Sequence, residues 1–149
     1  MEGRGMTTAG MRGHGFTVLI VEDDHQAGRT MTLLISWEFP QATVVSSDNG
    51  EEGVRIFREK SPDLVIADLD LPVLGGLEMI GRMRAVKKET PVLVVSAGGD
   101  PWWREKVALL GVTAAIGKPY RVQELFTAME AALGETVPGA IHRSYRISG

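Results

Sequence analysis

Acidic side chains follow two short apolar segments of the chain. Glu22-Asp23-Asp24 comes directly after the segment 16–21, and Asp68 and Asp70 follow the segment Leu64–Ala67. If these segments are neighbouring parallel strands, the five carboxylates lie at the sheet edge where such folds bind ligands. Carboxylates so close together repel one another and raise one another's pKa values. A divalent cation relieves that repulsion, and oxygen ligands with room for water predict Mg²⁺ (or Mn²⁺).

A hydroxyl and an amine are expected at the same edge. Ser96-Ala97 follows the apolar segment Val92–Val95, and Lys118 follows the segment Thr113–Ile116. A cation, a hydroxyl and a lysine around one aspartate form a site for a phosphoryl group, because the two positive groups offset its charge and the hydroxyl donates a hydrogen bond. Asp68 would be the nucleophile and its product an acyl phosphate. Each residue alone is more simply a cap, turn or surface residue, so the prediction depends on their combination.

The rest of the chain supplies elements that would position these residues. Five short apolar segments predict strands covered on both faces, namely 16–21, 42–45, 64–67, 92–95 and 113–116. Longer segments with helical spacing lie between and after them, and the last one carries an apolar stripe from Val122 to Leu133. Such alternation predicts an α/β fold, a parallel sheet with helices on both faces built from β-α units.

Turn and cap residues mark the ends of the expected helices. Asp48-Asn49-Gly50 suits the start of the second helix. Asp100-Pro101 combines a good N-cap with proline at the first helical position and so opens the fourth helix. Gly111 is well placed to end that helix.

Composition bounds the function further. The 149 residues are 44% hydrophobic and 23% charged, with a net charge of −3 and no cysteine. These values exclude thiolate metal sites and cysteine nucleophiles, and they argue against binding nucleic acid through the bulk surface. No segment is apolar for long enough to span a membrane. We expect a flexible leader over 1–15, one domain over 16–133 and a flexible tail over 134–149, which is too short for an output domain.

Five stretches together resemble the receiver domain of bacterial two-component response regulators, the chemotaxis-regulator-like fold. They are VLIVEDD (18–24), DNGEEGVRIF (48–57), PDLVIADLDLPVLGG (62–76), TPVLVVSA (90–97) and GKPY (117–120). The resemblance covers about residues 16–133, and the set is specific although each motif alone is weak. It implies a doubly wound (βα)5 domain with the flavodoxin-like strand order 2-1-3-4-5.

The resemblance also implies residue roles. Asp68 would be the phosphoacceptor, and Asp23 would bind Mg²⁺ directly. Glu22 would act through a coordinated water, and the backbone carbonyl of Asp70 would complete the protein ligands.

The phosphoryl-binding and switch positions would be Ser96, Ala97 and Lys118, with a cis peptide between Lys118 and Pro119. Gly76 matches a glycine of the family that follows the third strand.

The implied function is a cytoplasmic signalling switch. A histidine kinase or a histidine-containing phosphotransfer protein would donate the phosphoryl group, and an unknown downstream protein would read the altered surface. The domain would catalyse its own phosphorylation and dephosphorylation without being a turnover enzyme. We expect it to stand alone, with neither direct nucleic-acid binding nor membrane association.

The sequence departs from the family pattern at three places. Ala115 stands where the family often has tyrosine or phenylalanine, so the usual hydroxyl–aromatic switch cannot operate as described. The side chain of Asp70 would lie near the phosphoryl group, where its charge would slow anionic donors or perturb the attacking water. Trp102 and Trp103 adjoin this region; one ring is expected to pack on the domain, filling the space left at Ala115, and the other to form a partner surface.

Two other functions fit parts of the pattern. Asp68-Leu69-Asp70 is similar to the Asp-x-Asp of haloacid-dehalogenase-type phosphatases, but in that family the motif follows the first strand rather than the third. A pseudo-receiver, a binding module without phosphorylation, would keep the fold alone. Ala115 supports it slightly, while the acidic set, Ser96 and Lys118 weigh against it.

Overall fold

Five parallel strands form the centre of the molecule. The computed structural model describes residues 15–71, 74–98 and 103–136. The strands, in chain order, are β1 (Phe16–Val21), β2 (Ala42–Ser47), β3 (Leu64–Asp68), β4 (Val92–Ser96) and β5 (Ala114–Gly117). Their order across the sheet is β2-β1-β3-β4-β5, which confirms the expected fold and topology.

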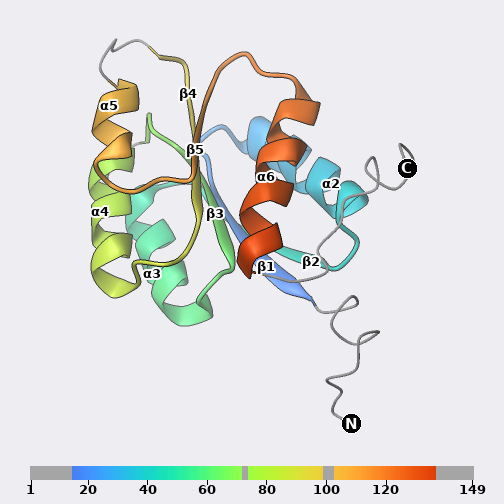
Figure 1. Cartoon of the computed structure of the whole chain (residues 1–149), viewed down its shortest axis with the longest axis horizontal. Helices are drawn as coiled ribbons and strands as arrows, with labels where there is room; N and C mark the ends of the chain where they lie inside the picture. The colour runs from blue at the N-terminus through green and yellow to red at the C-terminus, as the bar shows by residue number, and fades with distance from the viewer. Residues whose placement is uncertain (1–14, 72–73, 99–102, 137–149) are drawn as a thin grey trace, which may run out of the picture.

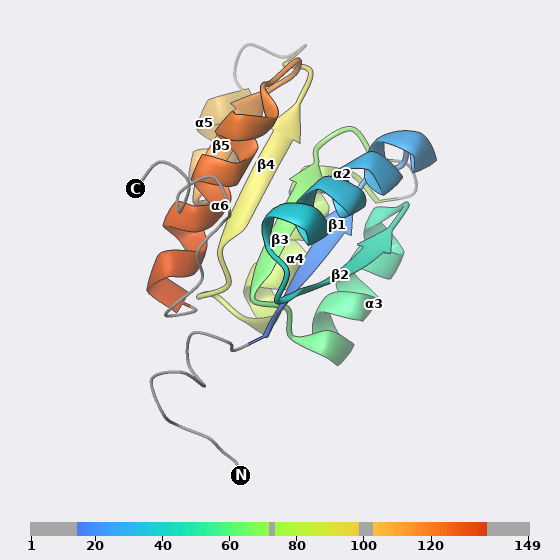
Figure 2. The same cartoon turned by 90° about the vertical axis from the view of Figure 1, so that its right-hand side faces the viewer.

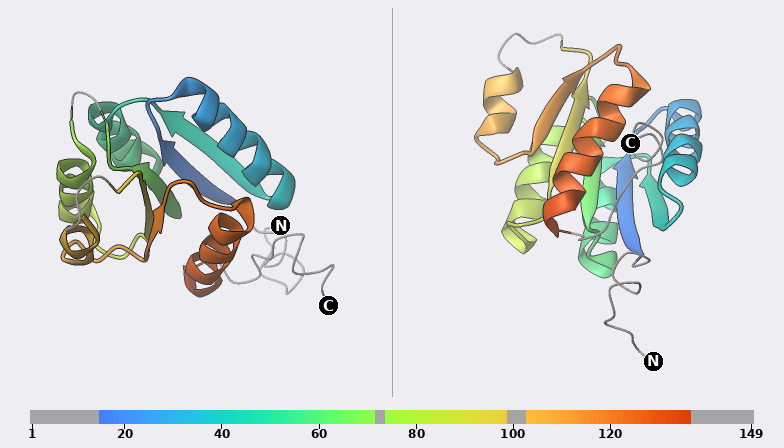
Figure 3. Two further views of the ribbon diagram at one scale, coloured as in Figure 1. Left: turned by 90° about the horizontal axis from the view of Figure 1, so that it is seen from above. Right: turned by 45° about the vertical axis from the view of Figure 1, so that its right-hand side comes forward.

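Helices cover both faces of this sheet (Figure 1). They are α2 (His25–Glu38), α3 (Gly50–Lys60), α4 (Gly76–Val86), α5 (Trp103–Ala108) and α6 (Val122–Thr136). Seen from above, α2 and α6 lie on one face and α3, α4 and α5 on the other (Figure 3). Parallel strands connected in this way need a crossover of helix length, which places the helices outside the sheet.

Each face has its own hydrophobic core. On the α2/α6 face, alternate strand residues such as Val18 and Ile20 pack with Phe39 and Phe126, whose rings meet edge to face at 6.1 Å. On the opposite face, Leu19 and other strand residues pack with side chains from α3, α4 and α5. Burial on both faces explains why the strand segments read as continuous apolar sequence rather than as alternation.

The element ends differ slightly from the expected ones. The strands β2, β3 and β4 each extend beyond the apolar segment, and β3 and β4 end on Asp68 and Ser96 themselves. Backbone pairing continues there although the side chains become polar, with Asp68 opposite Val95 and Ser96 opposite Gly117. The two side chains are therefore held by regular strands rather than by loops.

Helix boundaries also needed correction. The expected domain end at residue 133 is too early, because α6 continues to Thr136. Residues 1–14 and 137–149 of the expected leader and tail lie outside the described residues, as does the expected start of the fourth helix at Asp100-Pro101. The cap at Asn49 is confirmed, since its side chain accepts a hydrogen bond from the Glu52 amide at 2.9 Å. None of the described helices is long and apolar enough to cross a membrane.

Candidate functional site

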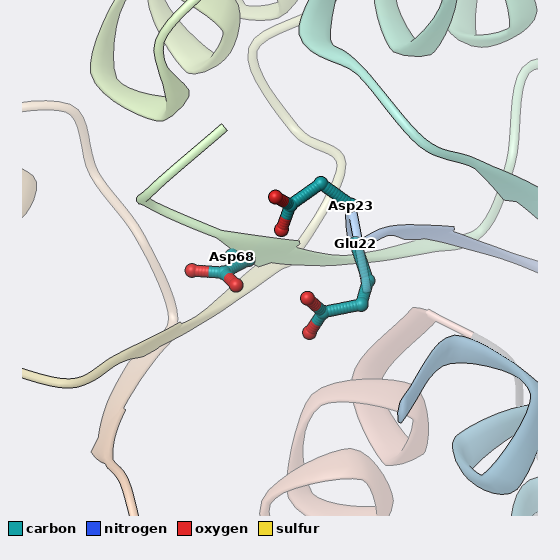
Figure 4. Close-up of side chains that lie close together, drawn as sticks. All are labelled: Glu22, Asp23 and Asp68. Atoms are coloured by element: carbon teal, nitrogen blue, oxygen red, sulfur yellow. The ribbon is translucent and has the colours of Figure 1, made fainter. Parts of the chain in front are cut away.

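Three carboxylates converge where β1 and β3 end (Figure 4). Glu22 and Asp23 follow β1, Asp68 ends β3, and one oxygen from each lies within 4.8 Å of the others. The two strands are adjacent and in parallel register, with Val21 opposite Ala67, so their polar ends must meet. Glu22 and Asp68 are only 7% and 5% exposed, whereas Asp23 faces solvent. The cluster thus has a buried floor and an open side.

Asp68 is held by two donors. The backbone amide of Asp70 donates a hydrogen bond to Oδ1 at 2.9 Å, and the ammonium of Lys118 donates to Oδ2 at 2.9 Å. Both contacts orient a carboxylate that is already fixed by the end of β3. Asp68 is the nucleophile predicted from the sequence, and its carboxylate also lies next to those of Glu22 and Asp23.

The loop after Asp68 requires glycine at position 76. A Cβ placed on Gly76 would lie 2.6 Å from Leu69 Cα and 2.9 Å from the Asp68 carbonyl oxygen. The Gly76 amide also donates a hydrogen bond to the Leu69 carbonyl at 3.2 Å. The first residue of α4 therefore lies very close to the backbone at the end of β3.

Lys118 connects two of the acidic groups. Its ammonium lies 2.9 Å from Asp68 and 3.6 Å from Glu22. Burial lowers the pKa of Lys118, but the neighbouring carboxylates of Asp68 and Glu22 outweigh that effect and raise it. Lysine therefore stays charged at this site.

Glu22 responds in the opposite way to its surroundings. Burial is the main cause that raises the pKa of Glu22 to about 7, and the charge of Asp68 adds to the shift. The Asp24 amide and Lys118 oppose it only in part. Burial thus disfavours the charged form of Glu22, and a hard cation bound by the acidic cluster would favour that form again.

Ser96 and Lys118 are joined through the backbone. The Lys118 amide donates to the Ser96 carbonyl at 2.7 Å, and the peptide between Lys118 and Pro119 is cis, as expected. Ser96 is buried, and its Oγ accepts a hydrogen bond from the Gly98 amide at 3.1 Å. Ala97, the third predicted phosphoryl-binding residue, is exposed at the end of β4.

Two of the five acidic residues at this edge of the sheet keep their side chains out of the cluster. The Asp24 side chain caps α2 instead, accepting hydrogen bonds from the amides of Gln26 and Ala27. The Asp70 side chain is exposed, and this residue reaches Asp68 through its backbone amide. A helix directly after β1 needs a cap, and that need takes the third acidic residue out of the cluster.

One of the two tryptophan rings packs on the domain near Ala115, as expected. Trp103 is only 8% exposed and belongs to the hydrophobic cluster against which Ala115 packs, so it is the packed ring rather than a partner surface. Trp102, its partner in that prediction, lies outside the described residues. Two features here were not foreseen: the proximity of Gly98 to Trp103, where an added Cβ would lie 3.1 Å from the indole nitrogen, and the hydrogen bond from Arg104 to the Ala115 carbonyl. Neither leaves a sequence signal, because each depends on how α5 sits against the sheet.

Comparison with known proteins identifies the family of the chain. A family model of the response regulator receiver domain matches residues 18–130. The chain belongs to this receiver-domain family. Its structure resembles the N-terminal domain of an uncharacterized protein from Wolinella succinogenes, with 36% identity, a TM-score of 0.75, and coverage of 82% of this chain and 97% of that one. A LuxR-family two-component response regulator from Aurantimonas sp. SI85-9A1 gives 26% identity, a TM-score of 0.74, and coverage of 81% and 86%.

Curated relatives of this receiver domain are longer proteins. The uncharacterized transcriptional regulatory protein YkoG of Bacillus subtilis is 32% identical over 122 residues, which are 82% of this chain and 51% of that protein. The cell cycle transcriptional regulator CtrA of Caulobacter vibrioides is 28% identical over 116 residues, 78% of this chain and 49% of that protein. The chain thus spans about half the length of the curated relatives it matches. Receiver domains are signalling domains rather than turnover enzymes.

Proposed function

We propose that this receiver domain is a phosphorylation-dependent signalling switch whose phosphoacceptor is Asp68. The observation that carries the proposal is the buried carboxylate of Asp68, bound by the Lys118 ammonium at 2.9 Å and facing the carboxylates of Glu22 and Asp23. A charged lysine, a hydroxyl and a cluster of carboxylates that can hold a cation surround this buried aspartate. Together they would form a binding site for a phosphoryl group.

The phosphoryl donor in this proposal is a phosphohistidine of a kinase or phosphotransfer protein. An Asp68 oxygen forms a bond to phosphorus while the phosphorus–nitrogen bond breaks. The electron pair of that bond returns to the imidazole nitrogen, which takes up a proton. Lys118 then pairs with a phosphoryl oxygen, and the Ser96 hydroxyl donates a hydrogen bond to another.

Mg²⁺ is the cation that we propose for the acidic cluster. Asp23 and Asp68 would bind it, Glu22 would act through a coordinated water, and the Asp70 carbonyl would complete the protein ligands. When bound, the ion offsets negative charge on the entering phosphoryl group. The exposed side of the cluster, at Asp23, leaves room for ordered waters, as Mg²⁺ requires.

The test is phosphorylation by a small donor. The protein is incubated with acetyl phosphate and Mg²⁺, and intact-mass spectrometry measures the adduct. We expect one phosphoryl group on the unchanged protein and none on Asp68→Asn. Asp24→Asn is the matched control, because asparagine still caps α2 and that carboxylate lies outside the cluster. An adduct that persists in Asp68→Asn would overturn the assignment.

The two competing functions predict other results. A pseudo-receiver would give no adduct with acetyl phosphate or with any histidine kinase. A phosphatase using Asp68-Leu69-Asp70 would release phosphate from added phosphomonoesters with turnover. The exposed Asp70 side chain and the position of the motif after β3 argue against the phosphatase.

The consequence of phosphorylation would be a changed surface for a downstream protein. The relatives are named as transcriptional regulators, whose length is about twice the part matched here. For this domain we propose protein contacts as the output, since the net charge of the chain is −3.

A further inference from the structure

Gly98, two residues after β4, lies close to the ring of Trp103. Gly98 has φ +73°, and a Cβ placed there would lie 3.1 Å from the indole nitrogen of Trp103. The same glycine donates its amide to the Ser96 hydroxyl at 3.1 Å. Gly98 therefore lies between Ser96, to which it is hydrogen-bonded, and the nearby ring of Trp103.

Trp103 is linked in turn to the edge strand of the sheet. The guanidinium of Arg104 stacks over the Trp103 ring, 4.7 Å from its centroid. The same guanidinium donates a hydrogen bond to the Ala115 carbonyl at 3.1 Å, and its other nitrogen would meet a Cβ on Gly117 at 3.4 Å. Arg104 thus lies beside β5, which is an edge strand of the sheet formed by the described residues.

The small side chain of Ala115 leaves room for the indole of Trp103 in the hydrophobic cluster between α5 and the sheet. Trp103 and Ala115 belong to the same buried cluster, and Trp103 is 8% exposed while Arg104 is exposed. Trp103 and Arg104 begin α5, which lies on the side of the sheet formed by β4 and β5 (Figure 2).

We infer that Trp103 and Arg104 are a positioning pair that couples the Ser96 hydroxyl to β5, in the place that Ala115 leaves without a ring. The inference rests on the proposed function. The Ser96 hydroxyl accepts a hydrogen bond from the Gly98 amide, and its proton is free to be donated to a phosphoryl group on Asp68. In this inference, drawing Ser96 toward the phosphoryl group also draws Gly98, which changes the surroundings of the nearby indole and the contact of Arg104 with the Ala115 carbonyl.

The first test isolates the signal of Trp103. In a Trp37→Phe, Trp102→Phe protein, Trp103 is the only remaining indole. Beryllofluoride with Mg²⁺ serves as the phosphoryl analogue, and fluorine NMR verifies that it is bound. We expect a shifted emission maximum and altered acrylamide quenching of Trp103 when the analogue binds, and no change in an added Asp68→Asn variant. Bound analogue with unchanged Trp103 emission would overturn the inference while leaving the proposed function intact.

A pair of glycine variants tests the contact itself. Gly98 and Gly111 have similar φ values of +73° and +68°, but a Cβ at Gly111 meets nothing within 4 Å. Both alanine variants therefore carry the same backbone strain. Gly98→Ala should alter Trp103 emission without any analogue, and Gly111→Ala should not. Equal emission in both variants would show that Gly98 does not control the ring.

Arg104 variants test the second half of the coupling. Because Arg104 is exposed, Arg104→Ala should fold. We expect Trp103 still to respond to the analogue, while the hydrogen-exchange rates of the β5 amides no longer change. Trp103→Phe, which keeps an aromatic ring against Gly98, should retain the β5 response, and Trp103→Ala should lose it. A β5 response that survives in both Arg104→Ala and Trp103→Ala contradicts the pair as the coupling route.

Discussion

Glu22 makes the metal-free domain sensitive to pH. Burial raises the pKa of Glu22 to about 7 from 4.5, so the folded state holds a proton that the unfolded state releases between these values. The contribution of Glu22 to the free energy of unfolding is therefore fully present below about pH 4.5 and is lost as the pH rises through about 7. We expect the urea midpoint in EDTA to decrease across this range. Glutamine has no carboxyl group to titrate, so the urea midpoint of Glu22→Gln should change less with pH. A parallel decrease in both proteins would assign the pH dependence to other groups.

Asp70 should tune the rate of phosphorylation. Its amide binds Asp68 Oδ1, which places an exposed carboxylate two residues beyond the nucleophile. Removing that charge in Asp70→Asn should speed phosphorylation by an anionic donor such as acetyl phosphate by roughly threefold, because exposed charges contribute about 1 kcal/mol or less. The dephosphorylation rate should also change, and both are measured by mass spectrometry over time.

The control for Asp70→Asn removes a distant charge of the same sign. Glu59→Gln does so at the last turn of α3, where the exposed side chain of Glu59 forms an ion pair with Arg55. Its phosphorylation rate should match that of the unchanged protein. If Asp70→Asn leaves both rates unaltered as well, the charge of Asp70 has no influence on the chemistry.

At the scale of elements, the sequence predicted the strands better than the roles of polar residues. Continuous apolar segments identify β1 to β5 because both faces of the sheet are covered. For Asp24 the sequence allowed either a helix cap or a place in the acidic cluster, and the start of α2 decides for the cap. The Arg104 contact with Ala115 joins α5 to β5, and no local pattern encodes such a tertiary contact.

The junction of β3 and α4 gives a further prediction. In Gly76→Ala, the added methyl group would lie 2.6 Å from Leu69 Cα, so backbone next to Asp68 must move. We expect a loss of about 1–3 kcal/mol in the free energy of unfolding, together with slower phosphorylation. Gly81→Ala, in the interior of the same helix with nothing within 4 Å, should instead gain roughly 0.5–1 kcal/mol. Urea denaturation measures both, and equal effects would show that the close approach is unimportant.

For the whole molecule, the parallel topology separates stability from chemistry. Two hydrophobic cores, one on each face, hold the sheet, while the carboxylates, Ser96 and Lys118 gather where the strands end. Burial and the charge of Asp68 both disfavour the charged form of Glu22 at that edge, and a bound cation would favour it. Global stability should therefore report occupancy of the site.

Mg²⁺ should stabilise the folded domain in proportion to its binding. A ligand that binds only the folded state adds RT ln(1 + [L]/Kd), about 2.7 kcal/mol at 100 times Kd. We expect the urea midpoint to rise with Mg²⁺ concentration in the unchanged protein and in Asp24→Asn, whose altered side chain caps α2 rather than joining the cluster. Asp23→Asn removes an exposed carboxylate of the cluster and should fold, but its midpoint should no longer respond. Equal Mg²⁺ responses in Asp23→Asn and Asp24→Asn would mean that the ion acts elsewhere on the surface, and the acidic cluster would then not be its site.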